Sequence, residues 1–399
     1  MTKSPRLTRR RVVALGLGTF AGASALSLLR QTNDKSQQMA ALNNNDLDFQ
    51  AAGNAPLKQR AIAKKLIYGG ASGYKELTSD QSFAEIFPQE CMVLMVGEDL
   101  MWRNVHPQLE TFSFTKADWL ANFAHKHKML FGSGLVWHGF MPDWFKEKVN
   151  KQNAKQVLQE HIEKVAGHFA GKVHLWHVVN EAILPKDGRS DGLRYTQFLE
   201  ALGPDYIEMS FRAASQADPN ALLFYNDYGL EYDVPDQEAK RTAILKLLER
   251  LKSKGTPIHG LGIQSHIGYN LDLKQSQLKT FMRDVADLGL QILISEVDVI
   301  DKNFPKNIQK RDRIVASVYK DYLDIVLAEP AVMGIITWGL SDRYTWHTWN
   351  EPRKDGAPVR PLPLDANLKR KLAWHVIARA FDRTAVRQNS PLWTAWSKL

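Results

Sequence analysis

Short apolar runs of strand length alternate with longer segments of helical periodicity from about residue 56 onward. Eight such runs are present: Leu66–Gly70, Met92–Val96, Met129–Trp137, Val173–Val179, Leu222–Asn226, Gly260–Gln264, Gln291–Glu296 and Gly334–Trp338. Between two of them, the segment Thr242–Lys254 ends at Gly255 and carries four apolar residues on one helical face: Ile244, Leu247, Leu248 and Leu251. The alternation predicts an α/β fold in which strands and helices follow one another.

Polar and aromatic residues end most of the apolar runs, and they favour a barrel over an open sheet. These run ends are Trp137-His138, Asn180-Glu181, Asn226-Asp227, Gln264-Ser265-His266, Glu296 with Asp298, and Trp338. In a (β/α)8 TIM barrel the carboxyl ends of all strands meet at one face, where active sites are built, whereas a doubly wound sheet, the competing fold, spreads them along a line. The pattern therefore predicts a single TIM-barrel domain with long loops, since about 250 residues or more suffice for that fold.

Two of these run ends supply glutamates. Glu181 follows its run in WHVVNEA (Trp176–Ala182), and Glu296 follows its run in QILISEVDV (Gln291–Val299). Hydrolysis of a glycosidic bond needs a proton donor for the leaving oxygen and a second carboxylate that attacks the sugar or activates water. Tryptophans offer flat apolar faces to pyranose rings, and Asn, Gln and His can bond hydroxyl groups. The set of residues predicts sugar chemistry.

Composition excludes several other classes of protein. The chain has 399 residues and a formal net charge of +9, and no dense basic run lies outside the extreme N-terminus, so a nucleic-acid partner is not expected. Cys91 is the only cysteine, which rules out an intrachain disulfide. The twelve histidines show no HExxH or comparable spacing, and no GxxxxGK[ST] loop is present, so neither a metal nor a cofactor is expected.

The N-terminus predicts export. Residues 1–30 contain the consecutive arginines Arg9, Arg10 and Arg11 and then an apolar stretch from Val12 to about Leu29, a pattern that resembles a twin-arginine signal. Residues 31–55 are rich in Asn, Gln and Asp and predict a polar linker, which leaves 56–399 as the barrel domain. We expect a periplasmic or secreted protein, and the alternative is a retained membrane anchor, because the apolar stretch is barely long enough to span a bilayer.

At this point the residues resemble a known family, glycoside hydrolase family 10, the endo-β-1,4-xylanases. LWHVVNEA resembles its WDVVNEA, and ILISEVDV resembles its TELD nucleophile strand. Further matches follow in order along the chain: LVWHGFMPDW (Leu135–Trp144), FYNDYGLE (Phe224–Glu231), GLGIQSHI (Gly260–Ile267), TWGLSDRYTW (Thr337–Trp346) and PLPLDANLKRKLAW (Pro361–Trp374). The likeness runs from about Leu57 to Phe381, and the combination of motifs is specific.

The resemblance implies a role for each matching residue. Glu181 takes the place of the general acid/base and Glu296 that of the nucleophile, while His266 and Asp298 match the residues that orient the nucleophile and keep it ionised. Other matching positions imply contact with the sugar: His138, Asn180, Asn226, Gln264, Trp144, Trp338, Trp346 and Arg343. The implied reaction is retaining, with one glutamate attacking the sugar and the other exchanging the proton.

Two departures from the family pattern bear on the substrate. Where the family has a PENEMKW-like stretch, this chain has VGEDLMW (Val96–Trp102), so that Gly97, Glu98 and Met101 take the positions of a Glu, an Asn and a Lys that bind the glycone sugars in the family. Shifting the alignment by one residue restores Glu98 as the Glu but leaves the lysine unmatched. His177 stands where the family strand has Asp.

Three hypotheses for function follow. The first is a retaining endo-xylanase that acts on xylan as a monomer, with no membrane partner. The second is a retaining barrel glycosidase that cuts another β-glucan or a decorated polysaccharide, which the altered stretch Val96–Trp102 favours. The third is a noncatalytic polysaccharide-binding protein, against which the joint presence of Glu181, Glu296, His266 and Asp298 argues.

Overall fold

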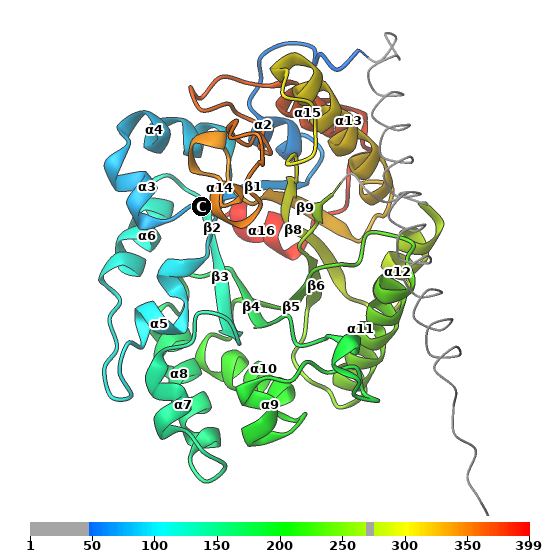
Figure 1. Cartoon of the computed structure of the whole chain (residues 1–399). Coiled ribbons are helices and arrows are strands. Elements are labelled where there is room, and N and C mark those ends of the chain that lie inside the picture. Colours follow the sequence, from blue (N-terminus) through cyan, green and yellow to red (C-terminus); the bar gives the residue numbers. More distant parts are fainter. Residues whose placement is uncertain (1–47, 269–274) are drawn as a thin grey trace, which may run out of the picture.

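A closed parallel β-barrel forms the centre of the molecule (Figure 1). The computed structural model describes residues 48–268 and 275–399. The barrel strands are β1 (Ile67–Ala71), β2 (Val93–Val96), β3 (Leu130–Trp137), β4 (Leu175–Asn180), β5 (Leu222–Asp227), β6 (Gly260–Ile263), β8 (Gln291–Val299) and β9 (Val332–Thr337). A two-residue strand, β7 (His266–Ile267), follows β6 and pairs with the same neighbour, β8.

The strands pair in the order in which they occur along the chain. Each lies parallel to the next, and the pairings of β6 with β8 and of β9 with β1 close the ring. All strands therefore point the same way, and their carboxyl ends meet at one face. The predicted (β/α)8 barrel is confirmed, and the doubly wound sheet is excluded.

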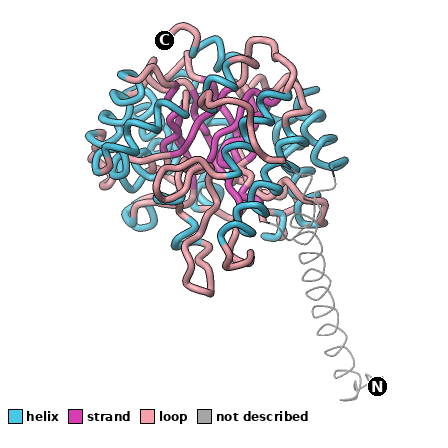
Figure 2. Tube along the Cα trace, turned by 90° about the horizontal axis from the view of Figure 1, so that it is seen from above, coloured by secondary structure: helices cyan, strands magenta, loops and turns pink. Residues whose placement is uncertain are grey.

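Helices surround the barrel, as the view from above makes plain (Figure 2). They are α2 (Leu57–Ile62), α3 (Tyr74–Ser79), α4 (Gln81–Glu90), α5 (Trp102–Val105), α6 (Thr115–Lys126), α7 (Asp143–Lys148), α8 (Ala154–His168), α9 (Gln197–Leu202), α10 (Tyr206–Ala217), α11 (Pro235–Ser253), α12 (Gln275–Asp287), α13 (Ile308–Val326), α14 (His347–Asn350), α15 (Leu372–Arg383) and α16 (Pro391–Trp396). Three short 3-10 helices lie in the loops: η1 (Glu98–Leu100), η2 (Pro185–Asp187) and η3 (Asp342–Tyr344).

Helix α11 shows how the sequence pattern and the structure agree and differ. The four apolar residues of its predicted face are buried, and the helix ends before Gly255, whose φ of +63° suits a residue without a side chain. The helix begins at Pro235, seven residues before the expected start at Thr242. Its first two turns are polar, so hydrophobic periodicity does not mark them, although Pro235 at the first helical position does.

The amino ends of the strands are covered by the C-terminal segment. Leu392 of α16 is buried in a cluster with Ile67, Val93 and Leu130, the first residues of three strands, and Trp393 and Trp396 pack against that cluster. The C-terminal helix α16 thus packs against the face of the barrel opposite the strand carboxyl ends.

The described residues begin inside the predicted linker. Phe49 is buried, the backbone carbonyl of Asp48 accepts from Arg379 of α15, and Arg60 of α2 bonds the carbonyls of residues 52, 53 and 55. Residues 48–55 therefore lie against the barrel domain, whereas their polar composition predicted a linker. The predicted export signal and residues 31–47 lie outside the described part of the chain.

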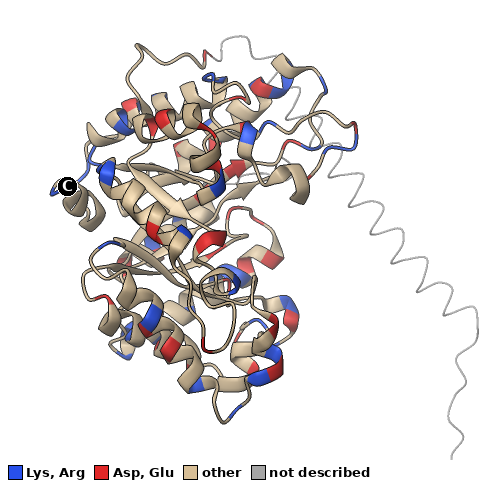
Figure 3. Ribbon diagram, turned by 90° about the vertical axis from the view of Figure 1, so that its left-hand side faces the viewer, with Lys and Arg blue, Asp and Glu red and all other residues tan. Residues whose placement is uncertain are grey.

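Basic and acidic residues are interspersed along the outer elements (Figure 3). Within the residues that the structure describes, no helix is both long and apolar enough to cross a membrane.

Candidate active site

A cavity of about 550 Å³ opens where the carboxyl ends of the strands meet. Both predicted catalytic glutamates line it, together with Asn180 at the end of β4 and Gln264 after β6. His266 on β7 and the tryptophans Trp338 and Trp346 also line it. The cavity therefore brings together side chains from five strands or their ends, which the sequence separates widely.

Glu181 occupies an unusual backbone position. It directly follows β4 and has a φ of +58°, a left-handed conformation that is uncommon outside glycine. Its N–H donates to the carbonyl of Asn226 (2.9 Å), and its own carbonyl accepts from Arg194 Nε (2.8 Å). Such a conformation costs on the order of 1–3 kcal/mol and persists where neighbouring contacts hold it. Here the two bonds hold the turn that delivers the carboxylate to the cavity.

The surroundings of Glu181 favour its protonated form. Burial raises the pKa of its carboxyl, and the negative charges of Asp227 and Glu296 raise it further, against a hydrogen bond from Gln264 Nε2 at 3.0 Å that lowers it. Asp227 lies behind the site as a buried ion pair with Lys240 of α11, at 2.6 Å. A carboxyl group with a raised pKa suits the role of proton donor near neutrality.

Glu296 is held differently. It lies on β8, is almost fully buried, and accepts a hydrogen bond from Asn226 Nδ2 (2.8 Å), while His266 Nε2 lies 3.3 Å from its other oxygen. Ser295 Oγ donates to Asn226 Oδ1 at 2.6 Å and so fixes which way the Asn226 amide faces. Asn226 and His266 thus contact different oxygens of Glu296 and fix the orientation of its carboxylate.

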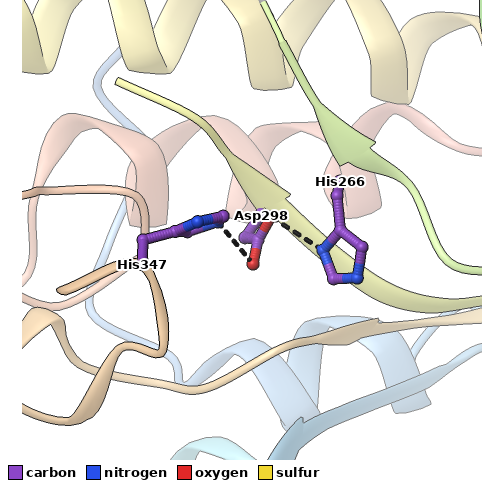
Figure 4. Close-up of side chains that lie close together, drawn as sticks. All are labelled: His266, Asp298 and His347. Atoms are coloured by element: carbon purple, nitrogen blue, oxygen red, sulfur yellow. Dashed lines mark hydrogen bonds and ion pairs between the residues drawn. The ribbon is translucent and has the colours of Figure 1, made fainter. Parts of the chain in front are cut away.

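The imidazoles of His266 and His347 flank the Asp298 carboxylate in a row (Figure 4), and His266 connects this row to Glu296. His266 Nδ1 lies 3.0 Å from Asp298 Oδ1, and His347 Nε2 lies 3.0 Å from Asp298 Oδ2, which also accepts from Trp346 Nε1 at 2.8 Å. Burial opposes a charge on His266, yet Asp298 and Glu296 outweigh it and raise its pKa to about 10. Burial likewise opposes a charge on Asp298, and the two histidines outweigh it and lower the pKa of Asp298. His266 is therefore a fixed cation beside Glu296.

The same three residues form a group whose ligand atoms lie within 4.8 Å of one another. Their close contacts are hydrogen bonds and ion pairs to one another, and His266 Nε2 faces Glu296. Both nitrogens of His266 are thus engaged with carboxylates, and in its protonated form the ring has no nitrogen lone pair to offer a metal ion. The arrangement of these side chains fits a row of ion pairs better than a metal centre.

A continuous chain of hydrogen bonds joins the two glutamates. Gln264 Nε2 contacts both Glu181 Oε1 and Asn180 Oδ1, at 3.0 and 3.2 Å. Asn180 Oδ1 accepts from Asn226 Nδ2 at 3.0 Å, and that amide also donates to Glu296. The positions of the two carboxylates are therefore coupled through three amide side chains.

Several residues expected to contact the sugar lie elsewhere. Trp144 of α7 is 7% exposed, packs against Trp102 and donates to the carbonyl of His106, so it belongs to the core. Arg343 bonds Asp80 and the carbonyl of residue 366, outside the residues that line the cavity.

Two other expected sugar contacts do not line the cavity either. Asn226 is fully buried and acts on Glu296 and Asn180. His138 follows β3 outside the lining, and its pKa falls to about 4 because of burial and the charges of Arg194 and Lys240.

Sequence reasoning missed three supporting residues. His347 directly follows Trp346 in a matched motif, so its position was a signal that could have been used. Asp227 ends β5 beside Asn226, and in the sequence it is one of several polar residues at run ends. Lys240 is one of several lysines on α11, and nothing in the sequence marks it as the partner of Asp227.

Known proteins resemble this chain in sequence. The model of the family described as "Glycosyl hydrolase family 10" matches residues 57–380. Endo-1,4-beta-xylanase B of Thermotoga neapolitana is 32% identical over 302 residues, which cover 74% of this chain and 84% of that protein. The beta-1,4-xylanase of Dictyoglomus thermophilum is 35% identical over 294 residues, which cover 70% of this chain and 79% of that protein.

Solved structures give the same result. Xylanase 10B from Thermotoga petrophila RKU-1, crystallised in complex with xylobiose, has a TM-score of 0.74 and 31% identity and covers 83% of this chain and 98% of its own. Native xylanase 10B from Thermotoga maritima has a TM-score of 0.74 and 31% identity, with coverage of 82% and 98%.

Proposed function

Because the chain belongs to glycosyl hydrolase family 10, we propose that it is a retaining endo-1,4-β-xylanase in which Glu181 is the acid/base and Glu296 the nucleophile. The observation that carries this proposal is the contrast between the two carboxyl groups. The pKa of Glu181 is raised, while Glu296 receives Asn226 and the cationic His266. Two glutamates in opposite protonation states are what the double displacement needs.

The first step breaks the glycosidic bond. Glu181 gives its proton to the leaving oxygen as a carboxylate oxygen of Glu296 attacks the anomeric carbon, so that a covalent glycosyl ester forms and a shortened chain leaves. Asn226 and His266 hold Glu296 in place, which limits the reorganisation required in the transition state.

The second step reverses the proton transfer. Glu181, now ionised, takes a proton from water, the water oxygen attacks the anomeric carbon, and Glu296 leaves as a carboxylate. In the covalent ester Glu296 carries no charge, so one of the charges that raises the pKa of Glu181 is absent. The pKa of Glu181 falls accordingly, which suits its change from acid to base.

The lining of the cavity supports a sugar polymer as the substrate. The rings of Trp346 and His266 are in contact, with centroids 4.9 Å apart. Trp349, which is 64% exposed, makes an edge-type contact with the ring of Trp346, with centroids 5.8 Å apart. These indoles continue from the cavity to the surface and offer stacking faces to successive sugars. The relatives named as xylanases, one of them crystallised with xylobiose, make xylan the first substrate to test.

The N-terminal pattern extends the proposal to location. A protein that acts on an extracellular polymer must reach it, and residues 1–30 resemble a twin-arginine signal. We infer that the enzyme works as a monomer in the periplasm or outside the cell.

Reducing-end release from soluble xylan, cellulose and mixed-linkage glucan tests the activity. We expect release from xylan by the wild type and a loss of roughly 10⁴- to 10⁶-fold in kcat for Glu296→Ala, as for removal of a nucleophile. Glu163→Ala, a change of an exposed glutamate on α8, is the matched control and leaves the rate unchanged. Release only from a glucan would assign the enzyme to another substrate, and binding without release from any polymer would leave a binding protein.

The stereochemistry of azide products separates the two roles. With an activated aryl xyloside, Glu181→Ala still forms the covalent ester, so azide yields the β-xylosyl azide. Glu296→Ala cannot form the ester, and azide entering the vacated space yields the α-xylosyl azide. Nuclear magnetic resonance of the products distinguishes them, and exchanged products would reverse the assignment of the two glutamates.

A further inference from the structure

One side of the catalytic cavity is largely apolar, and the exposed carboxylate of Glu98 is the polar neighbour of that side. Gly97, Met101, Gly134 and Phe140 form this side at the ends of β2 and β3, and we call these four residues the apolar wall. Met101 is 9% exposed, and its Cε fills the space beside Gly134, where an added methyl group would lie only 3.0 Å away. The ring of Phe140 stacks on that of Trp137, with centroids 5.7 Å apart and planes 26° apart.

The cavity offers no unpaired cationic side chain near the apolar wall. Among the described residues that line the cavity there is no Lys or Arg. His177 pairs with Gly134 in the β3–β4 register and is buried, which lowers its pKa to about 3 and leaves it neutral near neutral pH. The cation of the cavity, His266, is already paired with Asp298 and Glu296.

These features discriminate between kinds of sugar. An unsubstituted hydroxyl that contacts Met101 and Phe140 loses its bonds to water and gains none from these two side chains, a cost of about 1–3 kcal/mol. A uronic acid would bring a carboxylate toward Glu181 and Glu296 with no cation to receive it. A neutral ester avoids both costs, because an O-acetyl group replaces the hydroxyl donor with a methyl group that can contact Met101 and Phe140.

We propose that the apolar wall accepts an O-acetylated sugar of the polymer backbone, so that this enzyme prefers acetylated over unsubstituted xylan. Met101 and Phe140 are then the residues that determine this specificity, and Gly97, which has no side chain, leaves the room that the acetyl group occupies. The inference rests on the proposed xylanase function and adds the class of decoration that the substrate carries.

The test compares two substrates that differ only in acetylation. Soluble xylo-oligosaccharides with their natural O-acetyl groups, and the same preparation after alkaline deacetylation, are assayed at pH 6 for kcat/KM. We expect the wild type to favour the acetylated preparation roughly tenfold, the usual effect of one small apolar group in a fitting pocket. Equal rates, or faster cleavage of the deacetylated preparation, would overturn the inference while leaving the xylanase function intact. No cleavage of either preparation would contradict the function itself.

Two variants of one residue locate the effect. Met101→Gln keeps the length of the side chain but ends it in a hydrogen-bonding amide, and we expect it to abolish the preference by raising kcat/KM for the deacetylated preparation relative to the acetylated one. Met101→Leu keeps an apolar side chain and retains the preference. Thermal unfolding shows whether each variant is folded, and the comparison of substrates with the wild type decides the question even if Met101→Gln does not fold. A preference that survives in folded Met101→Gln would show that the apolar wall does not cause it.

Discussion

At the scale of single residues, identical side chains acquire opposite properties from their neighbours. Glu181 and Glu296 are both largely buried and both follow apolar runs, yet burial and two negative neighbours raise the pKa of one, while an amide and an imidazolium bond the other. Neither the residue type nor the strand-end position distinguishes them. The difference lies in Asp227, Asn226 and His266, which other strands bring into contact with them.

The charge of Asp227 should appear in the pH dependence of the reaction. Asp227→Asn removes a negative charge that raises the pKa of Glu181 and leaves Lys240 as an unpaired cation. Both changes lower the pKa of the acid, so we expect the alkaline limb of the kcat/KM profile to move to lower pH by up to about one unit. Asp236→Asn, which breaks an exposed ion pair with Lys186, should leave the profile in place. An upward shift for Asp227→Asn would contradict this electrostatic role.

The raised pKa of His266 should appear in the pH dependence of stability. Folding raises this pKa from 6.5 to about 10, so the folded state keeps a proton that the unfolded state releases between those values. The stabilisation is complete below about pH 6.5 and is lost as the pH rises toward 10, with a slope of at most about 1.4 kcal/mol per pH unit.

His266→Gln should remove this slope. The free energy of unfolding, measured in urea at pH 6 and pH 9, should fall more for the wild type than for the variant. His168→Gln, which changes a more exposed imidazole paired with Asp118, is the control. If the free energy of unfolding falls between pH 6 and pH 9 by the same amount in His266→Gln as in the wild type, His266 is not protonated in the folded state.

At the scale of elements, the strand ends and the loops that follow them place the chemistry. The β4–β5 pairing contains a register shift between His177 and Val179, and β4 then ends in the left-handed turn at Glu181. A shift of this kind changes which side chains face the interior. The alternation of apolar residues located the strand, while its irregular end, which presents Asn180 and Glu181 to the cavity, depends on pairing with β5.

The C-terminal helix α16 should contribute to the stability of the whole barrel. Leu392→Ala removes a buried side chain that packs on the amino ends of the strands, and we expect a loss of about 2–5 kcal/mol in the free energy of unfolding. Leu399→Ala, at an exposed position, should change it little. Urea denaturation measures the free energy of unfolding of both variants. Equal losses in the two variants would mean that the packing of α16 on the amino ends of the strands does not stabilise the barrel.

At the scale of the whole molecule, barrel closure converts separation along the chain into contact. Glu181 directly follows the fourth strand of the barrel and Glu296 lies on the seventh, and the amides of Asn180, Asn226 and Gln264 bridge them. An open sheet would place these strand ends along a line. The ring places them around one cavity, which is the physical basis for a two-carboxylate mechanism here.

The proposed export of the full chain would depend on the N-terminal arginines. Substitution of Arg10 and Arg11 by Lys should leave the full-length protein in the cytoplasm of a bacterium with a twin-arginine pathway, because that signal requires the arginine pair. Cell fractionation measures the distribution, and Lys at Arg6 and Arg30 is the matched control. Unchanged export of the Arg10 and Arg11 variant would contradict the signal, and recovery of the wild type in the membrane pellet would favour a retained anchor.

The sequence by itself determined the fold class, the eight strands and the two glutamates. Apolar runs of strand length, the spacing between them and the polar residues at their ends are local properties, so each can be recognised without knowing the neighbours. His266 and Asp298 were found in the same way, because they lie on or beside the strand segments that carry Gln264 and Glu296.

Only the tertiary structure decided which side chains face the cavity. Trp144 lies in the core and Arg343 bonds Asp80, although both belong to matching motifs. His347, Lys240 and the apolar wall gain their roles from elements that pack across the barrel or beside it. Packing partners, burial and the resulting pKa values arise from contacts between distant segments, and a pattern along one segment carries no information about the segment opposite.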